Sequence, residues 1–195
     1  MVAMDGFTGF KTAAGEELPD ATPVMDPFHV VRLAGDALDR TRQWIQQDAL
    51  GHRSHAGDPL YRARRTPCTT GARLLTEKQR ARIQAVFAIE EHVEVEATCG
   101  IYQRIVAAYR EPDKAKSEQM MRAVITSATS GVPTALVEIR RLGRTLRQRA
   151  KDVLAFFDRP GASNGPTEAI NGQLEHLRGF PEPYNYIARS GLLHG

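Results

Sequence analysis

The spacing of apolar residues divides the chain into an α/β segment followed by a longer helical segment. Val2–Met4 and Thr22–Met25 are short apolar runs that end in turn residues, a pattern typical of buried strands. Phe7–Glu17 and the segment that begins at Pro27 have the composition and apolar spacing of helices. Strand, helix, strand and helix with short links make a βαβ unit, so we expect the two strands to be parallel neighbours.

A polar linker and a series of helices follow. Residues 49–74 are basic and rich in turn residues, which predicts an exposed loop rather than core. Four helices are expected beyond it, over Thr76–Phe87, Val95–Arg110, Asp113–Ser130 and Pro133–Phe157, although the alternation at residues 92–97 would also suit a strand. The last helix is predicted by a continuous apolar stripe: Ile139, Leu142, Leu146, Ala150, Val153 and Phe157.

The end of the chain predicts one more helix, over Thr167–Arg178, with Pro166 in its first turn. Glu168 and Asn171 are three residues apart and therefore share a face of this helix. Both ends of the chain look cut, because a strand at residue 2 needs neighbours and the last residues form no closing element. We therefore expect upstream sequence to have been lost.

Positive charge is unevenly distributed on a nearly neutral background. The formal net charge is +3, yet residues 53–82 hold eight Lys or Arg against two acidic residues. A second basic cluster consists of Arg140, Arg141, Arg144, Arg147, Arg149 and Lys151. Four of its members have helical spacing: Arg140, Arg144, Arg147 and Lys151. Such clusters fit a polyanion such as nucleic acid, and a solvated helix face is the alternative.

Other classes of protein are disfavoured by the composition. No apolar run approaches the roughly 18 residues that a membrane span needs, and no signal-peptide pattern opens the chain. Cys68 and Cys99 are too far apart to predict a metal site or a disulfide framework. We expect a cytoplasmic protein.

Three carboxylates occupy positions typical of metal ligands: two follow predicted strands and one lies near a helix N-terminus. Asp5 and Asp26 each follow a predicted strand, and ligands gather at that edge of an α/β sheet. Glu168 lies near a helix N-terminus, where the helix dipole favours negative charge. Two-metal phosphoryl transfer uses such carboxylates to hold Mg²⁺. Each also has a structural alternative: a turn for Asp5, a helix cap for Asp26, a capping box for Glu168, and simple packing for His29.

Five segments occur in an order that resembles a known family. They are VAMDGFTGF (2–10), ELPDATPVMDPFHVVRLAGDALDR (17–40), GDPLYRARR (57–65), EATCGIYQRIVAAYREPD (96–113) and DVLAFFDRPGASNGPTEAINGQLEHLRG (152–179). Together they are similar to transposases of the ISL-three insertion-sequence family, and the similarity extends through nearly the whole chain.

The resemblance implies a DDE transposase, in which an Asp-Asp-Glu triad in a ribonuclease H-like domain holds Mg²⁺ or Mn²⁺. Asp5 matches the second triad Asp and Glu168 matches the Glu. Asp26 and His29 match an Asp-x-Phe-His motif beside the site, and Asn171 follows the Glu by one turn. The implied partners are double-stranded DNA, at the element's ends and the target, and other chains in a homo-oligomer or a mixed oligomer with intact transposase.

The expected fold class is α/β plus α: a partial ribonuclease H-like fold, with short parallel strands and helices, that carries a large, mostly helical insertion. Residues 1–48 would form the second half of the core, residues 49–150 the basic loop and helical insertion, and residues 151–195 the Glu-bearing helix that closes the core. DNA phosphates are expected to contact Arg62, Arg64, Arg65, Arg140, Arg144, Arg147 and Lys151.

The activity expected of the family differs from the activity expected of this chain, because no strand of the chain supplies the first triad Asp. The parental reaction is hydrolysis of the phosphodiester at the element's end, then attack of the freed 3′-hydroxyl on target DNA. With two of the three carboxylates, the chain itself is expected to show little or no catalysis. The alternatives are a non-catalytic helical DNA-binding remnant that regulates an intact transposase, and an unrelated helical interaction domain.

Overall fold

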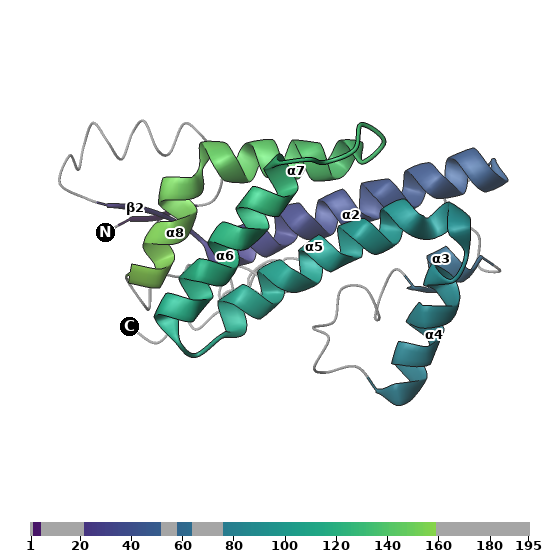
Figure 1. The fold of residues 1–195 in the computed structure, drawn as a ribbon, viewed down its shortest axis with the longest axis horizontal. Coiled ribbons are helices and arrows are strands. Elements are labelled where there is room, and N and C mark those ends of the chain that lie inside the picture. The colour runs from purple at the N-terminus through teal and green to yellow at the C-terminus, as the bar shows by residue number, and fades with distance from the viewer. Residues whose placement is uncertain (1, 5–21, 52–57, 64–75, 159–195) are drawn as a thin grey trace, which may run out of the picture.

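A computed structural model describes residues 2–4, 22–51, 58–63 and 76–158 of the chain. In this part of the protein, two short strands lie at one end of a group of long helices (Figure 1). Strands β1 (Val2–Met4) and β2 (Pro23–Met25) pair in parallel, as predicted, with Met4 opposite Met25. The described residues therefore form a helix-rich α/β structure.

Helix α2 (Pro27–Leu50) begins directly after β2. Its start is encoded locally, because the Asp26 side chain accepts a hydrogen bond from the backbone N–H of Phe28 and Pro27 occupies the first turn. The helix buries a stripe of side chains on one face and ends at Gly51, whose φ of 69° favours glycine. The predicted helix after Pro27 is thus confirmed.

In the described part of the chain, four helices form a bundle that has the strands at one end (Figure 1). Helix α2 packs against α5 (Val93–Arg110) and α7 (Val137–Gln148), and both of these also pack against α6 (Lys114–Thr129). A short 3-10 turn, η2 (Glu90–His92), leads into α5, so residues 92–97 are helical and not a strand. The centre of the bundle is filled by apolar side chains that are almost fully buried: Val30, Ala34, Val95, Ile105, Met121, Val124 and Leu146.

The prediction of one helix over Pro133–Phe157 was wrong, because this segment forms two helices. Helix α7 ends at Gln148, Arg149 has φ −105° and ψ 13°, and α8 (Ala150–Asp158) leaves in a new direction (Figure 1). The bend carries α8 onto β2, where Val153 and Phe157 are buried. The apolar stripe is real, but packing against the strands, which periodicity does not record, sets the direction of its second half.

The prediction that residues 49–74 form only an exposed loop was also wrong for the described residues 58–63. Helix α3 (Pro59–Ala63) starts there and buries Leu60 to 2% exposure. Asp58, itself 5% exposed, accepts hydrogen bonds from the Leu60 backbone N–H at 2.8 Å and from the side chain of Gln46. The bond from Gln46 ties the segment to α2, and the bond from Leu60 starts α3; together they satisfy a carboxylate that is too buried for water to do so.

Helix α4 (Glu77–Phe87) stands apart from the bundle (Figure 1). It begins where the sequence predicts, since Thr76 and Gln79 form a reciprocal capping box. Val86 is its one buried residue. Among the described residues, no helix is both long enough and apolar enough to cross a membrane.

Candidate functional site

The edge of the strand pair holds the candidate carboxylate Asp26. This residue follows the last residue of β2, caps α2 and is fully buried. Its Oδ1 atom accepts a hydrogen bond of 2.7 Å from the Phe28 backbone N–H. The structural alternative considered for Asp26, a helix cap, is therefore real, and any further role uses a carboxylate that the fold already holds in place.

The strand register relates Asp26 to the position of Asp5 in the chain. Met4 is the partner of Met25, and each is followed in the sequence by an aspartate. Asp5 itself lies outside the described residues, as do Glu168 and Asn171. Among the described residues, no group of three or more His, Cys, Asp or Glu is arranged to hold a metal ion. The described part of the chain therefore contains no complete metal site, and Asp26 is the predicted site carboxylate that it does contain.

An aromatic cluster that the sequence did not single out lies beside Asp26. Tyr109 of α5 stacks on Phe157 with ring centroids 5.5 Å apart and meets the edge of Phe156 at 5.4 Å. Burial raises the pKa of Tyr109, and the negative charge of Asp26 raises it further. Tyr109 therefore keeps its proton near neutral pH. Its hydroxyl has no hydrogen-bond partner in the described part of the chain.

His29 lies half-buried in the first turn of α2, one turn after Asp26. An Asp and a His three residues apart at a helix start lie on the same side of the helix. The structure thus places these two members of the predicted motif next to the sheet edge. Tyr109 could not have been found from the sequence, because its apolar neighbours mark it only as a core position.

The predicted DNA-binding residues fall into two groups. Arg64 and Arg65 lie outside the described residues, and Arg62 lies in α3. The other group is exposed on the outer side of α7 and on α8: Arg140, Arg144, Arg147 and Lys151. The sequence predicted that Lys151 continues the row of the three arginines. This prediction was wrong, because the helix breaks at Arg149 and Lys151 lies in α8.

The arginine row of α7 is available for a partner. Arg140, Arg144 and Arg147 take part in no salt bridge within the described ranges, whereas Arg141 on the neighbouring side pairs with Glu138 at 3.1 Å. Three guanidinium groups at spacings of four and three residues present charge along one face of a helix. Such a row suits a linear polyanion.

Comparison with protein families identifies the class of protein. The model of a DDE transposase family, the ISL-three transposases, matches residues 1–190. The chain belongs to this family of DNA transposases, which confirms the resemblance seen in its motifs. Neither the curated proteins nor the solved structures that were compared with the chain gave a match.

Replacing Asp26 tests its role in the fold. The substitution Asp26→Ala removes the acceptor for the Phe28 N–H and is expected to lower the free energy of unfolding by about 1–2 kcal/mol. Asp26→Asn keeps an acceptor oxygen and is expected to cost less. Urea denaturation measures both values. Equal stability of Asp26→Ala and the unaltered chain would contradict the capping role.

Proposed function

We propose that the chain provides part of the catalytic domain of a DDE transposase, which hydrolyses the phosphodiester at an element's end and joins the 3′-hydroxyl to target DNA. In this proposal Asp5 and Glu168 are the metal-binding carboxylates of a ribonuclease H-like core. Asp26, His29 and Asn171 support them, and the helices between residues 49 and 150 form an insertion that contacts DNA. Family membership supports the reaction class.

The observation that carries this proposal is the parallel register of β1 and β2. Met4 and Met25 are partners at one edge of the sheet, and they are the residues that directly precede Asp5 and Asp26 in the sequence. Ligands of open α/β sheets gather at the carboxyl ends of parallel strands. Neighbouring parallel strands are about 4.8 Å apart, so we expect carboxylates that directly follow two such strands to be close enough to serve one metal cluster.

Oxygen ligands of this kind fit Mg²⁺ or Mn²⁺. Bound there, the metal would polarise the phosphate and lower the pKa of the attacking hydroxyl. The chain's own contribution is to hold the ligands rigidly. Asp26 is fixed by the Phe28 N–H and by burial, so the sheet edge keeps its shape without a ligand.

A strand-transfer assay tests the proposed chemistry. Residues 1–195 contain two of the three carboxylates that the family pattern assigns, and misplaced or weakly held metal ions slow phosphoryl transfer severely. The 195-residue chain, incubated with labelled duplex DNA and Mg²⁺ or Mn²⁺, is therefore expected to give little or no joined product. Robust joining by this chain would contradict the expectation that two of the three carboxylates do not support catalysis.

The arginine row of α7 is expected to bind DNA phosphates. We expect weaker binding to unrelated duplexes when alanine replaces Arg140, Arg144 and Arg147. Each arginine that neutralises a phosphate releases a condensed counterion, and this release favours binding. The slope of log affinity against log salt is negative, and its magnitude is expected to decrease by about 0.9 for each phosphate that is no longer neutralised. Arg141→Ala is the control, since Arg141 lies on the same helix but pairs with Glu138. Fluorescence anisotropy over a salt series measures the slopes; equal slopes in both variants would contradict the proposal.

A second candidate function is favoured by the same exposed arginine row. A non-catalytic chain that binds DNA through its helices could regulate an intact transposase by forming mixed oligomers, and it would need no metal. Binding that is independent of Mg²⁺ and unchanged by Glu168→Ala would favour this function. For the catalytic proposal, we expect the chain to form homo-oligomers.

A further inference from the structure

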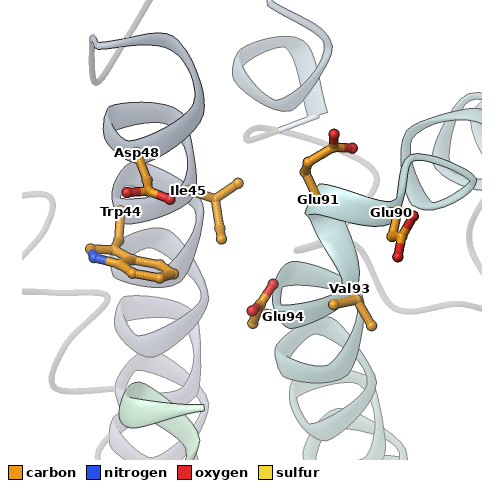
Figure 2. A pocket seen from close by; sticks show the side chains of 7 residues that line it. All are labelled: Trp44, Ile45, Asp48, Glu90, Glu91, Val93 and Glu94. Carbon is orange, nitrogen blue, oxygen red and sulfur yellow. The ribbon is translucent and has the colours of Figure 1, made fainter. Parts of the chain in front are cut away.

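A groove lies between α2 and the start of α5 (Figure 2). These parts of the two helices lie at the end of the bundle away from the strand pair (Figure 1). Its volume is about 490 Å³, and its apolar lining comes from Trp44, Ile45 and Val93. Ile45 is buried at its base, whereas Trp44 is 54% exposed and Val93 is 56% exposed. A large aromatic side chain that stays half in water beside another exposed apolar residue is typical of a binding surface.

Four carboxylates surround these apolar side chains. Asp48 extends from α2, and Glu90, Glu91 and Glu94 come from η2 and α5 (Figure 2). None of the four has a salt bridge to another described residue. Their negative charge disfavours DNA at this surface, and they are not arranged as a metal site. The groove therefore suits a cationic protein segment that also has small or apolar side chains.

Helix α4 of the same chain has this chemistry on its outer side. Lys78, Ala81, Arg82 and Ala85 follow one another at the spacing of a helix face, and all four are exposed. Val86, the buried residue of α4, borders this face roughly 90° around the helix from its centre, so burial of Val86 leaves the four side chains exposed. Two alanines allow close approach of a helix to a groove, and the flanking Lys78 and Arg82 can reach carboxylates on either side.

We propose that the groove binds helix α4 of a second copy of the chain, and that the reciprocal contact closes a two-fold symmetric dimer. Each chain has one cationic helix and one acidic groove. One two-fold symmetric arrangement therefore places the helix of each chain in the groove of the other. Arg82 is long enough to lie over the exposed face of the partner's Trp44, as guanidinium groups do on indole rings. The arginine row of α7 remains open in this dimer. The inference rests on the homo-oligomer proposed above, and it does not depend on the strand-transfer chemistry.

Charge reversal tests the contact on the full 195-residue chain, in EDTA and without DNA. Asp48→Arg with Glu91→Arg reverses one carboxylate on each wall of the groove, and Lys78→Glu with Arg82→Glu reverses the helix. Sedimentation equilibrium is expected to show a dimer for the unaltered chain that dissociates in 1 M salt, where the Debye length falls to roughly 3 Å. Each double variant is expected to raise the dimer dissociation constant at least about tenfold.

Mixing the two double variants provides the decisive result. In a mixed dimer the unaltered helix meets the unaltered groove, and the reversed helix meets the reversed groove, so both contacts are attractive again. The mixture is therefore expected to form a one-to-one dimer with a lower dissociation constant than either variant shows alone. The control, Asp36→Arg with Glu96→Arg, makes the same charge change on exposed positions of α2 and α5 outside the groove and should leave the dimer intact.

Several outcomes would overturn the inference. They are a monomeric unaltered chain, a dimer that the groove variant leaves unchanged, or no dimer in the mixture when circular dichroism shows both variants folded. Loss of the dimer on Arg144→Glu, with Lys78→Glu and Arg82→Glu harmless, would assign the groove to α7 and reject α4. A failed strand-transfer or metal experiment would leave the sedimentation result unaffected, so the two proposals fail separately.

Discussion

Gly143→Ala is expected to destabilise the chain by at least about 3 kcal/mol, among the largest effects expected of a single methyl group. Gly143 is buried where α7 crosses α6. A Cβ atom at this position would lie 1.9 Å from the carbonyl oxygen of Ala128 and 2.6 Å from its carbonyl carbon. These are backbone atoms, so no side-chain rotation relieves the overlap, and the two helices must move apart.

Gly100→Ala is the matched control, because Gly100 also lies within a helix but nothing stands within 4 Å of its Cβ position. There the added methyl group lowers the entropy of the unfolded chain, and a stabilisation of about 0.5–1 kcal/mol is expected. Thermal and urea unfolding measure both changes. Similar stabilities for the two variants would mean that α6 and α7 do not cross at Gly143 in solution.

Local chemistry made several helix boundaries predictable. Asp26 followed by Pro27 marks the start of α2, Thr76 with Gln79 marks the start of α4, and Asp113 caps α6. Each of these signals depends on residues within one helical turn. The sequence also predicted the two strands and their parallel pairing, because a βαβ unit has few other arrangements.

Features that depend on distant partners were not predictable. The break at Arg149 arises because α8 turns to cover β2, and the short α3 exists because Asp58 meets the buried Gln46 of α2. Apolar spacing along one segment contains no information about either partner. The same limit applies to Gly143, which reads as an unfavourable residue within a helix until Ala128 is seen opposite it.

The candidate site was predictable in part. Strand ends identified Asp26 as a sheet-edge carboxylate, and the structure adds that it is buried and caps α2. The family pattern, rather than any local signal, selected Asp5 and Glu168. Tyr109 lies next to Asp26 because the chain folds so that α5 passes the end of the bundle where the strands lie. No pattern near residue 109 in the sequence indicates this contact.

Iron-directed cleavage is expected to map the metal site onto the chain itself. Fe²⁺ takes the oxygen ligands used by Mg²⁺, and with ascorbate and peroxide it releases hydroxyl radicals that cut nearby backbone. If Asp5, Asp26 and Glu168 surround one metal, fragments should end near all three positions, although these lie far apart in the sequence. Weak occupancy is sufficient, because cuts accumulate with time. Excess Mg²⁺ should suppress them.

The most direct measurement of the central claim is this cleavage pattern, read by mass spectrometry in the unaltered chain and in three variants. Asp5→Asn and Glu168→Gln each remove a proposed ligand and are expected to lower cleavage at all three positions at least about tenfold. Asp36→Asn, an exposed carboxylate of α2, should leave the pattern unchanged. Cuts confined to the acidic groove near residues 48 and 90–94, or cuts near residues 5 and 168 that survive both substitutions, would contradict the claim that these carboxylates share a metal.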